Sequence, residues 1–134
     1  HGEYRRQRQM CIRDSSETLE LMKTNQIGDL NYEFQPTYNP SLIHAHEWYP
    51  NIKKKFTYGF LTNLEDLPGG RKAGSLAWSG ICNTYFWIDP YSGIAGTAMM
   101  QLSPHYDKRC ISILEALEKA SYSELDVLNN WSAT

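Results

Sequence analysis

Hydrophobic residues in the middle of the chain recur at every second position, which is the period of a β-strand. Between residues 55 and 62, Phe56, Tyr58 and Phe60 alternate with smaller or polar residues, and this pattern predicts one strand. Runs rich in aromatic and small apolar residues predict three more strands, at 74–80, 82–89 and 94–101. Turn-forming residues at 89–93 separate the last two runs, so we expect an antiparallel hairpin there.

Two other stretches have the apolar spacing of an amphipathic helix. Residues 107–122 carry one broad apolar stripe, which predicts a C-terminal helix. The stripe consists of Ile111, Leu114, Leu117 and Ala120, widened by Ile113 and Ala116. A shorter helix is predicted over 16–26, ending near Gly28. The sheet is the large apolar surface available, so we expect the C-terminal helix on one of its faces. Only the short helix is then left for the other face, and it is too small to cover it.

The remaining segments have no regular period. Residues 29–52 contain three prolines, so we expect a long irregular excursion that wraps another part of the fold. Residues 1–15 are polar and rich in arginine, which predicts a loose basic leader. The string RQRQMCIRDS within it looks like translated adapter sequence rather than native protein. Residues 123–134 are expected to form a tail, which leaves 16–122 as the folded part.

Composition and charge are those of a single soluble globular domain. The 134 residues are 41% hydrophobic and 21% charged, with a net charge of −2. Nine basic and 14 acidic groups fall in residues 14–134, so the body gives no electrostatic reason to expect a nucleic-acid partner. No apolar run approaches the roughly 18 residues that a membrane-spanning helix needs, so we expect no membrane partner. The cellular compartment stays open, because any targeting segment can be missing from this chain.

The candidate metal-binding and catalytic residues of the sequence are few. His44, His46 and Glu47, with His105 as a further nitrogen ligand, could be imagined around a metal ion, but their spacing fits no established site. Solvated histidines are the favoured interpretation, and no metal or cofactor is predicted. The chain contains no Ser-x-x-Lys and no Gly-x-Ser-x-Gly motif. Cys82 lies among aromatic strands, where a packed thiol is expected. The residues alone therefore offer no nucleophile.

The stretch GSLAWSGICNTYFWIDPYSGIAGTAMMQLSP at 74–104 is the most distinctive part of the sequence. It resembles the C-terminal part of the serine β-lactamase-related hydrolases, in the branch of class C-like enzymes, family VIII carboxylesterases and transesterases. The resemblance runs from about Asn25 to Tyr122, roughly three-quarters of this chain but only the last quarter to third of such an enzyme. It implies an α+β architecture, namely the C-terminal part of the β-lactamase/transpeptidase-like fold, with an antiparallel sheet and a terminal helix packed on one face.

The resemblance also assigns a site. Members of this family use a Ser-x-x-Lys nucleophile, a Tyr-x-Asn or Tyr-x-Ser element and a Lys-Thr-Gly-like triplet. Trp78, Ser79 and Gly80 stand at the triplet, and the N–H of Ile81 would be one of two oxyanion-hole donors. Two other strings mimic family motifs, and both are interpreted as chance matches. They are Tyr49-Pro50-Asn51, which lies too close to the triplet, and Lys23-Thr24-Asn25, which lies on a predicted helix.

The resemblance implies a fragment of a serine hydrolase that works through an acyl-enzyme. Trp78 in place of lysine removes the charge that would attract a β-lactam carboxylate, so a small-molecule ester is the expected substrate. Because the nucleophile is absent, the chain is expected to be inactive alone. The alternative is a small non-catalytic binding module with an aromatic recognition surface. That surface would consist of Trp48, Tyr49, Trp78, Tyr85 and Trp87.

The fragment hypothesis has a structural corollary. In the family, the last strand of the C-terminal part pairs with strands that come from the N-terminal part. Residues 94–101 should therefore present an unpaired edge here, through which copies of the chain can self-associate.

Overall fold

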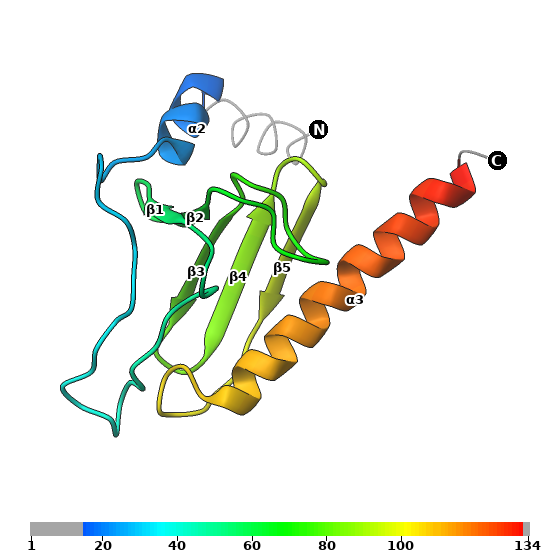
Figure 1. Ribbon diagram of the computed structural model, residues 1–134. Helices are drawn as coiled ribbons and strands as arrows, with labels where there is room; N and C mark the ends of the chain where they lie inside the picture. The colour runs from blue at the N-terminus through cyan, green and yellow to red at the C-terminus, as the bar shows by residue number, and fades with distance from the viewer. Residues whose placement is uncertain (1–14, 133–134) are drawn as a thin grey trace, which may run out of the picture.

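The computed structural model describes residues 15–132, with side chains through residue 125. A short helix is followed by an antiparallel sheet and a long C-terminal helix (Figure 1). The elements are α2 (Ser16–Lys23), β1 (Lys54–Phe56), β2 (Leu61–Asn63), β3 (Leu76–Gly80), β4 (Thr84–Asp89), β5 (Ile94–Ala98) and α3 (Lys108–Ser132). The leader predicted for 1–15 lies outside the described residues apart from Ser15. No helix in the described part of the chain is long and apolar enough to cross a membrane.

The sheet is a simple meander in which each strand pairs with the next one along the chain. Its order is β1-β2-β3-β4-β5 and all four pairings are antiparallel. The predicted strands at 74–80, 82–89 and 94–101 are confirmed, as is the hairpin that joins the last two.

The single strand predicted over 55–62 is wrong. The chain reverses within it, and Phe56 pairs with Leu61 across a tight turn. Gly59 has φ +105°, a backbone conformation that residues other than glycine rarely adopt. The alternation of Phe56, Tyr58 and Phe60 therefore spans two short strands and the turn between them.

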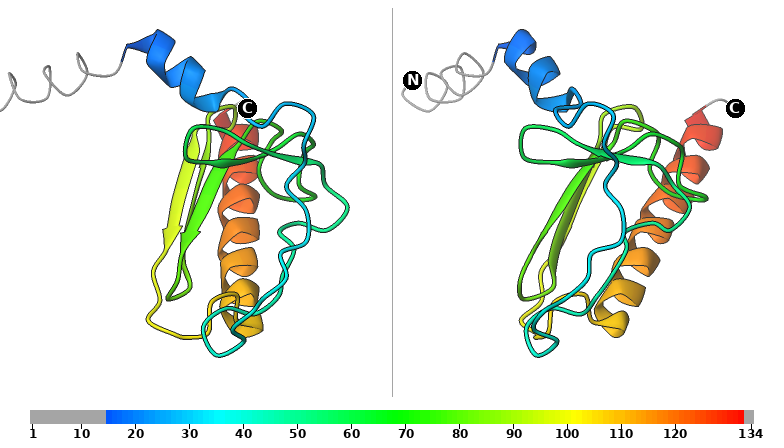
Figure 2. Two further views of the ribbon diagram at one scale, coloured as in Figure 1. Left: turned by 90° about the vertical axis from the view of Figure 1, so that its left-hand side faces the viewer. Right: turned by 60° about the vertical axis from the view of Figure 1, so that its left-hand side comes forward.

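The core lies between one face of the sheet and α3, and large aromatic side chains fill it. Tyr85 and Trp87 are both 1% exposed and alternate along β4 toward the helix. Register places Ala77 and Gly96 on either side of Trp87. A Cβ on Gly96 would lie 2.1 Å from the indole, so glycine at this position is what lets the tryptophan pack against β5. Figure 2 shows the helix lying along this face of the sheet.

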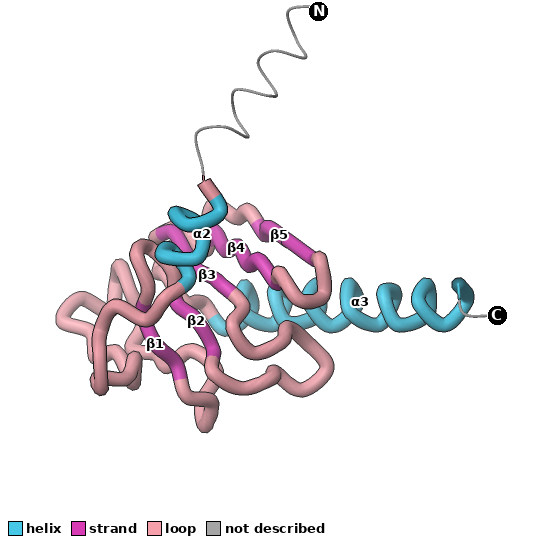
Figure 3. The backbone as a smooth tube through the Cα atoms, turned by 90° about the horizontal axis from the view of Figure 1, so that it is seen from above, coloured by secondary structure: helices cyan, strands magenta, loops and turns pink. Residues whose placement is uncertain are grey.

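The opposite face of the sheet is incompletely covered. Ile88 on β4 remains 38% exposed, and α2 contributes no buried residue. In the view from above, α2 lies over one end of the strands while β5 stands at the open margin of the sheet (Figure 3). The prediction that the short helix would be an insufficient cover is confirmed.

Both helices differ in length from their predictions. Ser15 caps α2 by accepting a hydrogen bond from Thr18 N–H at 3.1 Å, and the helix ends at Lys23 rather than at 26. Asn25 stops it, because its side-chain oxygen accepts from Ile27 N–H at 3.0 Å in a local turn. At the other end of the chain, α3 continues to Ser132, so residues 123–132 extend the helix that was predicted to end at 122.

The buried stripe of α3 is also rotated from the predicted one. Leu117 is 41% and Ile113 58% exposed, although both were assigned to the apolar face. The buried positions recur every fourth residue and are Cys110, Leu114, Glu118 and Tyr122. The apolar pattern missed this face because a carboxylate occupies its middle, and unpaired carboxylates are not expected in a core.

Glu118 is buried because Arg71 meets it. Arg71, in the loop between β2 and β3, donates from Nε and Nη2 to the two carboxylate oxygens at 2.8 and 2.6 Å. The guanidinium also donates to the Tyr49 hydroxyl and lies 5.0 Å from the centre of that ring. Burial by itself lowers the pKa of Arg71, but the hydrogen bonds and the charge of Glu118 outweigh it, so the pKa is raised. The guanidinium of Arg71 therefore stays charged inside the protein.

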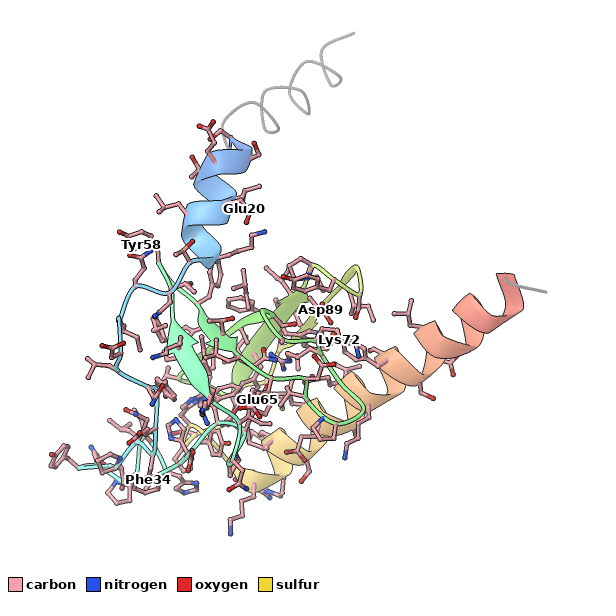
Figure 4. The ribbon with its side chains drawn as sticks, turned by 45° about the horizontal axis from the view of Figure 1, so that its top comes forward. Glu20, Phe34, Tyr58, Glu65, Lys72 and Asp89 are labelled. Atoms are coloured by element: carbon pink, nitrogen blue, oxygen red, sulfur yellow. The ribbon has the colours of Figure 1, made fainter. Side chains whose placement is uncertain are left out.

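Asp89 joins the same loop and the helix to the end of β4. Its carboxylate accepts from the Lys72 N–H and the Tyr122 hydroxyl, each at 2.9 Å. Burial raises the pKa of this carboxyl, yet the donors that surround it lower the pKa overall. Lys72 and Asp89 can be seen together between the sheet and α3 in Figure 4.

Removing the charge of Glu118 should destabilise the fold strongly. Glu118→Gln leaves the buried Arg71 guanidinium without its counter-charge, a loss that costs about 3 kcal/mol or more of unfolding free energy. Urea denaturation followed by circular dichroism measures it. Glu20→Gln is the matched control, because the Glu20–Lys23 pair lies on the surface of α2 and should contribute less than about 1 kcal/mol. Equal losses in the two variants would contradict this account of α3 docking.

Candidate functional site

The triplet assigned by resemblance lies at the end of β3 and leads into a tight turn. Trp78 pairs with Phe86, Ser79 with Tyr85 and Gly80 with Thr84. Residues 81–83 then form the turn into β4, and Asn83 takes the left-handed conformation with φ +59°. The four predicted residues, Trp78, Ser79, Gly80 and Ile81, thus run continuously from a central strand to an exposed turn.

Trp78 is half-buried and held by two other aromatic side chains. Phe56 meets its indole edge-on, with ring centres 4.9 Å apart. Tyr32, from the irregular segment, makes a second edge contact at 6.2 Å. Such contacts stabilise beyond the area that they bury. The indole is therefore fixed in place and brings no charge to this end of the strand.

Ser79 faces the buried side of the sheet, where it contacts a histidine that lies 26 positions later in the sequence. Its Oγ is 3.3 Å from Nε2 of His105. His105 is only 7% exposed, and its Nδ1 has no hydrogen-bond partner among the described residues. Burial and the neighbouring His46 lower the pKa of His105 below its ordinary value, although a hydrogen bond with the Gly80 backbone opposes them.

Gly80 and Ile81 form the open part of the site. A Cβ on Gly80 would come no nearer than 3.6 Å to Thr84, so space remains beside this backbone. The Ile81 side chain is 53% exposed. None of the backbone hydrogen bonds found in the loops and turns of residues 15–132 is donated by Ile81 N–H. An approaching acceptor can therefore bind this N–H without displacing a partner within that part of the chain.

Asn83 fixes the turn from inside, although it is not among the site residues predicted from the sequence. The residue is fully buried, and its amide nitrogen donates to the carbonyls of Leu102 and Pro104 at 2.9 and 2.8 Å. Its side-chain oxygen accepts from the Tyr85 hydroxyl at 2.7 Å and from Asp107 N–H at 3.0 Å. An asparagine ahead of an aromatic strand was the available signal, but three of its four partners, in Leu102, Pro104 and Asp107, lie 19 to 24 residues away in sequence.

The interpretation of solvated histidines is wrong. His44 and His46 are half-buried, and the His46 ring stacks on Tyr106 with centres 4.3 Å apart. The ring of His105 meets His46 edge-on at 5.7 Å. Among residues 15–125 no group of three or more histidine, cysteine, aspartate or glutamate side chains is arranged to hold a metal ion. These histidines instead pack the segment around Ile43 against the segment around His105, which form a parallel bridge.

The chance-match strings have structural roles. Tyr49 lies against the Arg71 guanidinium. Lys23 pairs with Glu20 at the end of α2, and Asn25 forms the turn that follows it.

The aromatic recognition surface proposed as an alternative does not form. Trp48, Tyr85 and Trp87 are buried in the core, with exposed fractions of 3% or less. Tyr49 and Trp78 are packed against that core. A binding module that uses these five side chains is therefore excluded by their burial.

Parts of this chain are similar in sequence to two acyltransferases. No protein-family model matches the chain. It is 35% identical over 75 residues to monacolin J acid methylbutanoyltransferase of Aspergillus terreus, which covers 54% of this chain and 18% of the relative. It is 33% identical over 82 residues to the ML-236A carboxylate methylbutanoyltransferase mlcH of Penicillium citrinum, which covers 60% and 20%. The chain thus spans about a fifth of the length of these relatives.

Solved structures agree on the architecture. Unliganded simvastatin synthase (LovD) from Aspergillus terreus superposes with a TM-score of 0.53 at 33% identity, over 55% of this chain and 19% of that one. The LovD6 mutant of the same enzyme superposes with a TM-score of 0.64 at 23% identity, over 84% and 29%. The chain has the fold of the C-terminal part of β-lactamase/transpeptidase-like enzymes. The predicted fold class is confirmed, whereas the similarity does not select the class C or carboxylesterase branch.

The buried imidazole makes the stability of the fold pH-dependent. Because the pKa of His105 is lower in the folded state than in the unfolded chain, the unfolded chain binds more protons as the pH falls. Stability should therefore be constant above about pH 7.5 and decline below the ordinary histidine pKa of about 6.5. Urea midpoints measured between pH 8 and 5 test this, and His105→Gln should show a shallower decline over the same interval. Parallel profiles would show that another group controls the response.

Proposed function

We propose that residues 76–81 form one wall of an acyl-transfer site in a longer serine enzyme. Trp78, Ser79 and Gly80 stand in the Lys-Thr-Gly position, and Ile81 N–H is one oxyanion donor. The observation that carries the proposal is the Ile81 turn, where an N–H without a loop or turn acceptor in the described residues lies beside the unobstructed Gly80. Similarity to methylbutanoyltransferases supports the same chemistry.

The nucleophile in this proposal comes from polypeptide outside the 134 residues. A serine hydroxyl gives its proton to a base that also lies outside the 134 residues, its Oγ attacks the ester carbonyl, and the carbonyl oxygen takes up the negative charge. The Ile81 N–H and a second donor stabilise that oxyanion, a contribution of about 3 kcal/mol per donor in an intact site. The tetrahedral intermediate then expels the alcohol, which receives a proton, and leaves an acyl-serine. Transfer of the acyl group to water or to another hydroxyl releases the enzyme.

Trp78 narrows the substrate class. A lysine at this position can attract a substrate carboxylate, but an indole held between Phe56 and Tyr32 brings no positive charge. An uncharged small-molecule ester is therefore a better substrate than a β-lactam. Whether the acyl group goes to water or to another hydroxyl depends on the part of the site that lies outside this chain.

Two forms of the protein test this function. The 134-residue chain alone should not hydrolyse p-nitrophenyl acetate above the buffer rate, because it has no Ser-x-x-Lys. Extending the reading frame upstream should reach an in-frame Ser-x-x-Lys, and the extended protein should be acylated by the ester and lose activity in Gly80→Val. Hydrolysis that follows the purified short chain and disappears in Trp78→Ala would refute the proposal, as would an upstream frame without that motif.

We also infer that the outer edge of β5 is an association surface for a second copy of the isolated chain. Within residues 15–132, β5 pairs only with β4 and stands at the margin of the sheet. Residues 90–106 contain no aspartate, glutamate, lysine or arginine, although charged residues are a common device for protecting a strand edge. Met99 beyond the strand is 79% exposed.

A charge placed on this edge should weaken the association. Thr97 lies exposed in the middle of β5, so Thr97→Lys should shift the chain toward monomer in sedimentation velocity runs over a concentration series. Ser112→Lys adds the same charge on an exposed position of α3 and should leave the distribution unchanged. A wild-type chain that stays monomeric at the highest concentration would refute the self-association.

A further inference from the structure

The turn between β3 and β4 is a short hairpin loop that ends on an asparagine. Gly80 pairs with Thr84, so residues 81–83 form the loop, and Asn83 has φ +59°. The last residue of a hairpin loop of this length commonly takes the left-handed conformation. Glycine adopts that conformation without strain, and asparagine is one of the few other residues that tolerate it. The shape of the loop by itself therefore calls for a glycine and leaves the side chain of Asn83 to be explained.

The side chain of Asn83 is fully buried and forms as many hydrogen bonds as a primary amide can. Its Nδ2 donates to the carbonyls of Leu102 and Pro104 at 2.9 and 2.8 Å. Its Oδ1 accepts from the Tyr85 hydroxyl at 2.7 Å and from Asp107 N–H at 3.0 Å. An amide group has two N–H donors and an oxygen that can accept two hydrogen bonds. All four are used here.

These bonds tie the loop to the segment that links β5 to α3. Leu102 and Pro104 lie in this link, and Asp107 immediately precedes the first residue of α3. The link also holds the backbone of the loop, because Leu102 N–H donates to the Cys82 carbonyl at 3.3 Å. A buried polar network in which every member is satisfied makes the surrounding structure rigid. Asn83 is therefore a fixed point between the loop and the link.

Ile81 lies two residues before this fixed point. Its side chain is 53% exposed, and its N–H donates none of the backbone hydrogen bonds found in the loops and turns of residues 15–132. Both of its neighbours are held, Gly80 by pairing with β4 and Cys82 through its carbonyl. The position of the Ile81 N–H therefore depends on how firmly the rest of the loop is held.

We propose that Asn83 is a positioning residue for acyl transfer: its four buried hydrogen bonds hold the loop at 81–83, so that the Ile81 N–H stays in place for the oxyanion. The inference rests on the proposed function for its chemical meaning, whereas the effect of Asn83 on the loop can be tested separately. Asn83 touches no substrate in this scheme. A donor that is already held in place is effective because it needs no reorganisation when the charge develops.

Asn83→Gly tests the proposal without straining the backbone. Glycine adopts the left-handed conformation readily, so a residue needed only for the shape of the turn should tolerate this change. If the side chain holds the loop, the Ile81 amide of the 134-residue chain should become mobile. Its order parameter from NMR relaxation should fall from the rigid range of about 0.85 to below about 0.6. An unchanged order parameter in a folded Asn83→Gly chain would overturn the proposal.

Tyr85→Phe separates loss of the hydrogen bonds from the flexibility of glycine itself. It removes one donor to Asn83 and leaves the sequence of the loop intact. The order parameter of the Ile81 amide should therefore fall, by less than in Asn83→Gly. An Ile81 amide as rigid as in the wild type would assign the loosening in Asn83→Gly to glycine and refute the role of the network.

Asn63→Gly is the matched control. Asn63 is 4% exposed, and its amide also donates to two carbonyls, those of Glu65 and Lys72 at 2.7 and 3.0 Å. These bonds hold the loop after β2 rather than the loop after β3. Asn63→Gly should destabilise the chain and leave the Ile81 amide rigid. Equal loosening of Ile81 in Asn63→Gly and Asn83→Gly would contradict a specific effect of Asn83.

Kinetics of the upstream-extended protein test the consequence for acyl transfer. Asn83→Gly should lower kcat about tenfold, a part of what loss of an oxyanion donor costs, with KM changed less than about twofold. Tyr85→Phe should lower kcat by a smaller factor, and folded Asn63→Gly should match the wild type. An active extended protein with an unaffected Asn83→Gly variant would refute the positioning role. A loosened Ile81 amide together with a catalytically inert extended protein would instead refute the proposed function and leave the effect of Asn83 on the loop standing.

Discussion

The structure depends on a buried ion pair that holds the long helix against the sheet. Arg71 and Glu118 are both removed from water, and a charge buried in this way is tolerated only beside an opposite charge. Each carboxylate oxygen of Glu118 has a guanidinium donor, and Tyr49 adds an acceptor and a ring face to the cation. This geometry fixes both the rotation of α3 and its position along its own axis. It therefore also fixes where the first turn of α3, which follows the segment that carries His105, lies against the sheet.

The candidate site is held rigid because the docked helix α3 fixes the segment that precedes it. The link before α3 supplies carbonyls to Asn83 and the imidazole that contacts Ser79. The turn around Ile81 is therefore shaped by residues about 20 positions away rather than by its own sequence. An oxyanion donor stabilises a transition state best when it needs no reorganisation during the reaction. A turn held on both sides by one segment meets that requirement.

The same structure shows which surfaces the fold leaves uncovered. Three of the five aromatic side chains that could have formed a recognition surface are fully buried, so they form part of the core. The exposed parts of the molecule include the edge of β5, Ile88 on the outer face of the sheet and the Ile81 turn. These features accord with a chain that spans about a fifth of the length of its methylbutanoyltransferase relatives. The fold is therefore compatible with the proposal that residues 76–81 form one wall of an acyl-transfer site.

The sequence by itself determined the strands at 74–101, the hairpin between the last two of them and the fold class. Alternating apolar residues, turn-forming residues and short family motifs carry this information, because each is a signal within a short stretch of sequence. It misjudged residues 55–62, where a glycine turn splits one apparent strand. Only the tertiary structure decided which face of α3 is buried, since Glu118 enters the core through a partner 47 residues away. The meeting of Ser79 with His105 was likewise decided by chain packing. Periodicity reports where apolar surface lies, whereas a buried polar group is stable only beside a partner that the folded chain brings to it.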